Sequence, residues 1–138
     1  MEWKVFLVVP ALAALPASAG LYNQPYGLVE SGRRSDVRKE LPVVIGSVDG
    51  VSTRNPRYSD PIAPGRHRIQ VNFSTSSMPT ARAFRFLDLD IKPCTRYRVV
   101  AAYQNLVHPA SWEPRIYVEP IGECATRFQA RMYGDRRA

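Results

Sequence analysis

The residues of this chain that could carry out chemistry begin with two histidines, which in a suitable pattern would bind a metal or act as bases. His67 and His108 are far apart, and neither belongs to an H-x-H or H-x-x-x-H pattern. A zinc site needs three or four ligands at short spacing, so we expect no metal centre. His67 falls on the apolar side of an expected strand, where an imidazole more often packs and hydrogen-bonds a backbone carbonyl. No cofactor-binding motif is present, and we expect no cofactor.

A hydrolytic triad is the second chemistry to consider, because Ser111, His108 and Glu113 are neighbours in one expected loop. The members of a triad normally come from separate elements, and the serine lies on a strained turn beside an oxyanion hole. Neighbours within one loop rarely meet these conditions. The sequence therefore favours a protein that is not an enzyme.

Two acidic residues, Asp88 and Asp90, share one face of an expected strand and could form an acid–base pair or a calcium site. Arg96 and Arg98 repeat the same spacing on the next expected strand. This match favours cross-strand ion pairs on a solvated face, each contributing less than about 1 kcal/mol.

The only two cysteines, Cys94 and Cys124, are expected to form a disulfide, because an even cysteine count in a secreted chain is typical of one. Neither has a second metal ligand close to it in the sequence. If the adjoining strands pair in the register that sets Cys94 opposite Cys124, Val100 lies opposite Val118 and one face of the pair becomes apolar. The closed loop would stabilise the fold by about 3.5 kcal/mol.

The first nineteen residues predict a cleavable secretory signal. Lys4 precedes an apolar run over residues 5–15, and the small residues 17–19 follow it. The run is too short to cross a bilayer as a helix, and Pro10 interrupts it. We expect cleavage before Gly20, a periplasmic or secreted protein, and no transmembrane segment in the mature chain. An uncleaved membrane anchor is the alternative.

Short apolar runs separated by turn residues organise the rest of the chain. Residues 20–40 show little apolar periodicity and predict a flexible leader that packs weakly. Asp49-Gly50 is a strong hairpin turn between two short β-branched runs. The expected strands cover 43–48, 51–53, 66–73, 83–91, 97–103 and 115–121, and a basic tail, 125–138, could form a short helix. Six to seven strands predict one all-β domain over residues 41–124, a small antiparallel β-sandwich of immunoglobulin-like kind with one disulfide.

A resemblance supports the same class. The segment Val48-Asp49-Gly50 followed by residues 61–71 (PIAPGRHRIQV) resembles the "DG … PG-x-H-x-v-x-v" pattern of PEGA-type and transthyretin-like, or carboxypeptidase-regulatory-like, β-sandwich domains. Residues 93–102 and 114–124 resemble small exported proteobacterial proteins. The likeness covers residues 43–124, although Ile62-Ala63-Pro64-Gly65 stands where the Pro-Glu-Gly-Ala signature would be. It implies a non-catalytic accessory or binding domain and transfers no active-site residue.

The formal net charge of +7 predicts polyanionic partners. We expect contact with anionic envelope polymers or lipid headgroups, or with another envelope protein, whereas nucleic acid is disfavoured because no nucleic-acid-binding fold is recognised. The loop before the last strand gathers aromatic and polar residues, and the tail adds arginines. The candidate binding residues are Tyr103, His108, Trp112, Arg115, Tyr117, Arg127, Arg131, Arg136 and Arg137. Alternatively, Trp112 only plugs the end of the sandwich.

These patterns predict an exported, non-catalytic binding or structural accessory domain of the bacterial envelope. The alternative is a small periplasmic hydrolase that acts on envelope material. A hydrolase should show a concave pocket with converging polar groups and a perturbed titrating residue, whereas a binding module should show a flat or edge surface without them.

Overall fold

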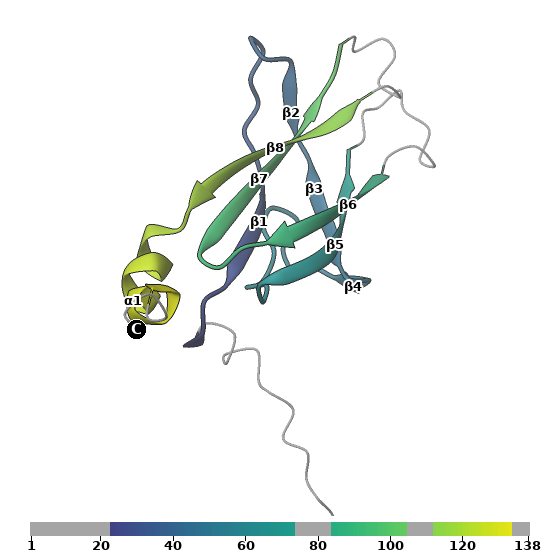
Figure 1. The fold of residues 1–138 in the computed structure, drawn as a ribbon. Coiled ribbons are helices and arrows are strands. Elements are labelled where there is room, and N and C mark those ends of the chain that lie inside the picture. The colour runs from purple at the N-terminus through teal and green to yellow at the C-terminus, as the bar shows by residue number, and fades with distance from the viewer. Residues whose placement is uncertain (1–22, 74–83, 105–111, 134–138) are drawn as a thin grey trace, which may run out of the picture.

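The computed structural model describes residues 23–73, 84–104 and 112–133, and these ranges form eight strands and one helix (Figure 1). The strands are β1 (Gly27–Ser31), β2 (Glu40–Pro42), β3 (Val44–Val48), β4 (Val51–Ser52), β5 (Gly65–Asn72), β6 (Phe84–Ile91), β7 (Thr95–Ala102) and β8 (Glu113–Pro120), and the helix is α1 (Gly122–Tyr133). The predicted all-β class is confirmed. The strands β1 and β2 were not among the ranges expected from local pattern.

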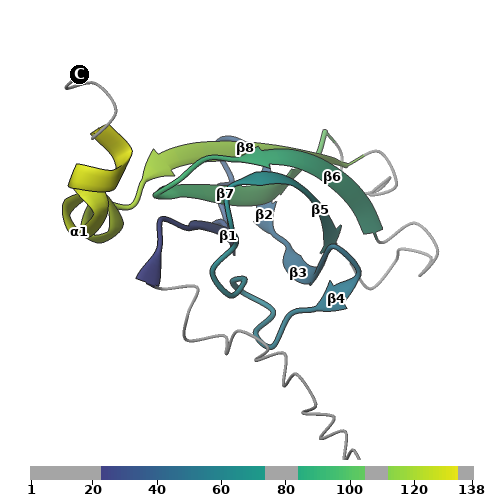
Figure 2. The same cartoon turned by 60° about the horizontal axis from the view of Figure 1, so that its bottom comes forward.

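Strand β7 is the centre of the first sheet. β8 pairs with its whole length in antiparallel fashion, while β1 and β2 share its other edge. The pairing of β1 with β7 is parallel, and the other described strand pairs are antiparallel. The second sheet has the order β4-β3-β5-β6. The two sheets pack face to face, and α1 lies at one end of the sandwich, beyond the end of β8 (Figures 1 and 2).

The hydrophobic core lies between the sheets. The alternation expected over residues 66–73 is observed, since Ile69 and Val71 point inward and are fully buried. The first sheet contributes Val29 and Val99, also fully buried. Burying one such side chain stabilises the fold by roughly 1.5–3 kcal/mol, so β-branched residues at alternate positions decide which face of each strand turns inward.

The expectation of a weakly packing leader over residues 20–40 is wrong for the described part, which begins at residue 23. β1 lies within this segment, and its Val29 belongs to the core. β7 pairs with β1, and the segment 57–59 hydrogen-bonds to it as well, through the N–H of Ser59 to the Val29 carbonyl at 2.8 Å. All these partners are distant in sequence, so local composition gives no sign of them.

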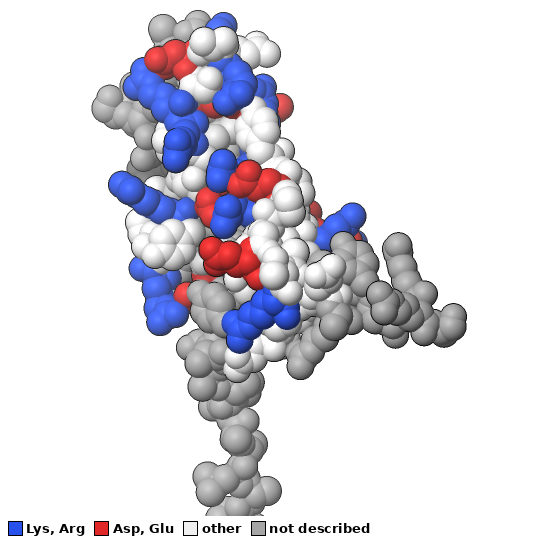
Figure 3. All heavy atoms as spheres, turned by 90° about the vertical axis from the view of Figure 1, so that its left-hand side faces the viewer, with Lys and Arg blue, Asp and Glu red and all other residues white. Residues whose placement is uncertain are grey.

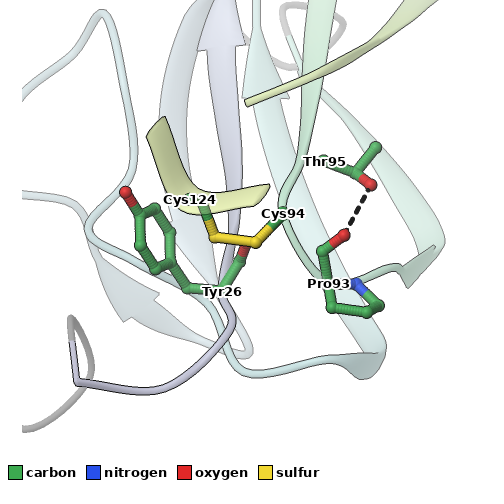
Figure 4. The surroundings of a disulfide bond; sticks show 5 residues. All are labelled: Tyr26, Pro93, Cys94, Thr95 and Cys124. Atoms are coloured by element: carbon green, nitrogen blue, oxygen red, sulfur yellow. Dashed lines mark hydrogen bonds between the residues drawn. A yellow bond between two sulfur atoms is a disulfide. The ribbon is translucent and has the colours of Figure 1, made fainter. Parts of the chain in front are cut away.

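Cys94 and Cys124 form a disulfide, as predicted (Figure 4). The expected register of β7 with β8 is wrong, because Tyr97 and not Val100 lies opposite Val118. β8 ends before Cys124, which lies in the first turn of α1. The first turn of α1 therefore places the Cα atom of Cys124 5.2 Å from that of Cys94. The disulfide does not require the two cysteines to lie opposite each other in paired strands.

The disulfide belongs to a second, smaller hydrophobic cluster at the α1 end of the molecule. Ile121 and Phe128 are buried there against Tyr26 and Leu28. The N–H of Cys94 donates to the Tyr26 carbonyl at 2.8 Å, which ties the chain before β1 to the same place. α1 departs from helical dihedral angles at Phe128 (φ −112°, ψ 15°). Within the described ranges, no helix has the length and apolar character needed to cross a bilayer.

Candidate functional site

The expected binding residues at the start of β8 do not form one cluster. Trp112 is 1% exposed, and its ring packs edge-on against Phe73 with ring centroids 5.3 Å apart. The Arg85 guanidinium covers the same indole at 5.0 Å from its centroid. Trp112 thus occupies the position of a plug. Arg115 and Tyr117 lie on the opposite, outer face of the first sheet because side chains alternate along a strand.

The other candidates are dispersed over the molecule. Tyr103 is half-buried, and its N–H donates to the Lys39 carbonyl at 3.0 Å. Arg127 lies on α1 and donates to Asn23 Oδ1 at 3.2 Å. The predictions for His108, Arg136, Arg137 and the Arg131 side chain lie outside the described residues.

Arg115 and Tyr117 enclose a buried carboxylate, Glu40 of β2, which is 1% exposed. Arg115 Nη1 lies 2.9 Å from Glu40 Oε2, and the Tyr117 hydroxyl donates to the same oxygen at 2.5 Å. Arg38 Nε lies 2.9 Å from Glu40 Oε1. Burial raises the pKa of Glu40, but the hydrogen bonds from Tyr117, Arg115 and Arg38 outweigh it, so the net pKa is lowered. Glu40 is therefore held as an anion, which suits a structural role and not proton transfer near neutral pH.

A second ionic network continues along the same face. Arg96 Nε lies 2.6 Å from Glu30 Oε1, and Arg98 Nη2 lies 2.7 Å from Glu119 Oε1. The two arginines come from β7, and the two glutamates come from its neighbours β1 and β8. On the side of the molecule where β8 and α1 lie, basic and acidic side chains are interleaved (Figure 3). Arg96 and Arg98 are thus neutralised by Glu30 and Glu119.

The expected pairing of Asp88 and Asp90 with the arginines of β7 is wrong. Both aspartates lie on β6, which belongs to the other sheet. Asp88 Oδ1 lies 3.1 Å from Arg68 Nε across the β5–β6 pair. The hydrogen bond from Arg68 and its charge lower the pKa of Asp88. Asp88 thus forms an ion pair, as expected, but its partner lies on β5 and not on β7.

His67 meets the expected backbone carbonyl and also an aspartate. Its Nε2 lies 2.7 Å from the Ala63 carbonyl oxygen, and its Nδ1 lies 2.5 Å from Asp49 Oδ2. Asp49 and Gly50 have positive φ angles of 50° and 81°, the geometry of the predicted Asp-Gly hairpin turn. The pKa of Asp49 is lowered by the hydrogen bond from the Arg68 N–H and then by the one to His67. With both ring nitrogens facing acceptors, His67 is occupied as a connector between two loops and is not free to activate a nucleophile.

A cleft of about 610 Å³ opens at the end of the sandwich where the chain passes from β2 to β3. Three arginines line it, Arg33, Arg34 and Arg57, together with an apolar wall that includes Pro42, Val44 and Pro56. The buried ring of Phe73 forms part of its floor. The lining includes Ser31 and Gly32, at the C-terminal end of β1, whereas α1 lies near the other end of that strand (Figure 1).

Backbone hydrogen bonds to both sheets hold the segment that carries Arg57. The Ser31 N–H donates to the Arg57 carbonyl at 2.7 Å, and the Ile45 N–H donates to the Pro56 carbonyl at 2.9 Å. Because Ser31 belongs to the first sheet and Ile45 to the second, this segment is fixed between them. The guanidinium of Arg57 extends from a rigid support at the rim of the cleft.

Close packing sets the position of Arg33. The preceding residue, Gly32, donates its N–H to the Val99 carbonyl at 2.8 Å. A Cβ at Gly32 would lie 2.3 Å from Val100 Cγ1, so a larger residue would push the chain away from β7. The glycine therefore lets the chain continue close to the sheet and brings Arg33 to the cleft.

The electrostatics of the cleft differ from those of the outer face of the first sheet. Arg34 pairs with Asp36 at 2.8 Å. Arg33 and Arg57 are exposed, and no carboxylate in the described ranges lies within ion-pair distance of either guanidinium. The arrangement can bind an anion, because two guanidinium groups without a carboxylate partner among the described residues line a cleft with an apolar wall.

Local sequence pattern gave little sign of this site. Neither Arg57 nor the cleft was foreseen, because the lining comes from four separate segments of the chain. Among the described residues, no group of three or more His, Cys, Asp or Glu side chains could hold a metal ion. Comparisons with protein-family models, with curated proteins and with solved structures found no match.

Proposed function

We propose that this protein is an exported, non-catalytic binding module that contacts anionic components of the bacterial envelope. The observation that carries the proposal is the cleft in which Arg33 and Arg57 have no carboxylate partner in the described ranges, while most other described arginines are paired. An exposed cation that the fold does not neutralise is available to an anionic ligand. The cleft is concave, whereas a flat or edge surface was the expectation for a binding module.

A non-catalytic role is supported by the state of the titratable groups. Among the described residues, the carboxylates with clearly shifted pKa values are Glu40, Asp49 and Asp88, and hydrogen-bond partners lower the pKa of each. A general acid or base works best with a pKa near the operating pH, and these shifts lead away from it. Both nitrogens of His67 are likewise engaged.

Export is supported by the signal-like residues 1–19 and by the disulfide, because a disulfide persists in oxidising compartments. We expect protein recovered from the periplasm of an expressing bacterium to begin at Gly20, as intact mass would show. Full-length chain recovered from the membrane fraction would contradict export by cleavage.

Anion binding is tested with purified mature protein and lipopolysaccharide, anionic vesicles or a soluble polyanion such as heparin. We expect binding whose affinity falls steeply as salt rises through the physiological range, because screening weakens contacts between exposed charges. Deleting residues 134–138 tests the contribution expected from Arg136 and Arg137 and leaves the buried Phe128 in place. Salt-independent binding, or no binding to any of these anions, would contradict the proposed function.

A further inference from the structure

We propose that the cleft holds one anionic lipid, with its phosphate between Arg33 and Arg57 and the beginning of an acyl chain along the apolar wall. This inference rests on the proposed function and names the ligand class. Two guanidinium groups suit a phosphate because each presents parallel N–H donors to its oxygens. The same groups alone would accept a sugar phosphate or a free phosphate equally well.

The apolar wall distinguishes a lipid from a purely polar anion. Pro42, Val44 and Pro56 are exposed, and Val44 keeps 45% of its surface in solvent although it lies on a strand. A polysaccharide bound to the arginines would leave this surface in water or cover it with hydroxyl groups. An acyl chain would remove it from water, a gain of about 25 cal/mol per Å² of apolar area.

The position of the wall next to the cations strengthens the case. Elsewhere on the described surface, Val118 of β8 is 62% exposed, but its cross-strand neighbour is Tyr97. Arg96 and Arg98 point to the other face of the sheet, where they pair with Glu30 and Glu119. At the cleft, exposed apolar residues and two arginines that lack a carboxylate partner in the described ranges line the same hollow. A lipid with a charged phosphate and an apolar chain has the same two-part chemistry.

The first experiment measures binding to vesicles of phosphatidylcholine with and without phosphatidylglycerol. Arg57→Gln should lower affinity for the anionic vesicles about fivefold, the effect of about one arginine at a charged lipid surface. The matched control is Arg66→Gln on β5, an exposed arginine outside the cleft that also lacks a described carboxylate within ion-pair distance. This control removes the same charge and should change affinity less than twofold. Equal losses in the two variants would mean diffuse attraction and would overturn the cleft as the lipid site.

The second experiment uses soluble probes and the unmodified mature protein, so it does not depend on any variant folding. Dihexanoyl phosphatidic acid below its micelle concentration should shift the NMR amide signals of Val44 and Phe73. It should bind about tenfold more tightly than glycerol 3-phosphate, as expected if roughly two methylene groups are buried. Val44→Thr should reduce this preference, whereas Val118→Thr, a matched change at an exposed valine of β8 that does not line the cleft, should leave it unchanged.

The outcomes separate this inference from the proposed function. Equal affinity for dihexanoyl phosphatidic acid and glycerol 3-phosphate would identify a phosphate site and overturn the lipid assignment, while anion binding would stand. If the protein binds heparin strongly but dihexanoyl phosphatidic acid does not shift the amide signals of Val44 and Phe73, the proposed function stands and the lipid site in the cleft is rejected. If the protein binds neither anionic vesicles nor heparin, both the proposed function and the lipid site are rejected.

Discussion

The outer face of the first sheet and the cleft at the end of the sandwich use the same side chain in opposite ways. On the sheet, Arg96 and Arg98 lie between glutamates of the two neighbouring strands, and Arg115 reaches the buried Glu40. At the cleft, Arg33 and Arg57 have no such partner among the described residues. On the sheet, strand pairing places a carboxylate beside each of these arginines. Arg33 and Arg57 lie in connecting segments, where no paired strand places an acidic residue opposite them.

Net charge is therefore a poor guide to where a basic protein binds its ligands. The chain has 19 Lys and Arg residues, but many arginines in the described ranges are bound to carboxylates of the same molecule. Changes on the sheet should therefore affect stability, and changes at the cleft should affect binding.

The largest effect is expected for Trp112→Ala. Truncating a fully buried tryptophan typically costs about 3–5 kcal/mol, because a cavity replaces its contacts. Since the ring also packs against Phe73, which forms part of the cleft floor, this variant should lose both stability and lipid binding. Urea unfolding measures the first and vesicle titration the second. An unchanged unfolding midpoint would mean that Trp112 is no plug.

The double variant Cys94→Ser, Cys124→Ser should cost roughly 3.5 kcal/mol through the lost constraint on the unfolded chain. The disulfide lies at the α1 end, away from the cleft (Figures 1 and 4). At a temperature where the variant is still folded, vesicle binding should equal that of the parent. Thermal unfolding with and without reductant provides the matching measurement, and an identical melting temperature in both would contradict a stabilising bond.

Tyr117→Phe removes one donor from the buried Glu40 carboxylate and keeps the ring. A hydrogen bond to a charged group contributes about 1.5–3 kcal/mol, so we expect a loss of about 2 kcal/mol in the free energy of unfolding. Anionic vesicle binding should not change, because no charge is removed. If Tyr117→Phe weakens vesicle binding and leaves stability unchanged, the outer face of the sheet takes part in binding, contrary to this expectation.

Acid should weaken the same network. The lowered pKa of Glu40 means that its carboxylate stabilises the folded state above the ordinary value of 4.5, and this contribution is lost as pH falls from 4.5 through the folded-state pKa. Glu40→Gln should be less stable at neutral pH and should lose less stability than the parent over that acid interval. Asp49 and Asp88 also have lowered pKa values and remain in both proteins, so the two curves should converge without becoming flat. Parallel curves would show that Glu40 is not the titrating group.

The smallest effect on stability is expected for Arg57→Gln. Its exposed side chain has no described carboxylate partner, and surface substitutions of this kind usually change the free energy of unfolding by less than about 0.5 kcal/mol. The backbone of Arg57, which carries the hydrogen bond from Ser31, is unaffected. A large destabilisation would show that this arginine belongs with the paired group on the sheet.

Much of the fold was determined by local sequence. Alternation over residues 66–73 set the inward face of β5, the Asp49-Gly50 dipeptide set the β3–β4 turn, and two cysteines in a chain with a signal-like start indicated the disulfide. Each of these depends on contacts between near neighbours in the chain or on a residue count. Two-residue periodicity and turn propensities can be recognised in the sequence because they depend on residues that are close together in the chain.

Which of the described charges are neutralised depends on the order of the strands in the folded protein. The sequence suggested that Arg96 and Arg98 would meet Asp88 and Asp90, but strand order gave them Glu30 and Glu119. From the sequence, Arg115 was expected to bind a ligand. In the folded protein β2 and β8 both pair with β7, and Arg115 contacts Glu40 instead. The cleft likewise needs four segments to converge. Ion pairs and concave sites depend on non-local strand order, and local spacing carries no information about which distant strand will lie alongside.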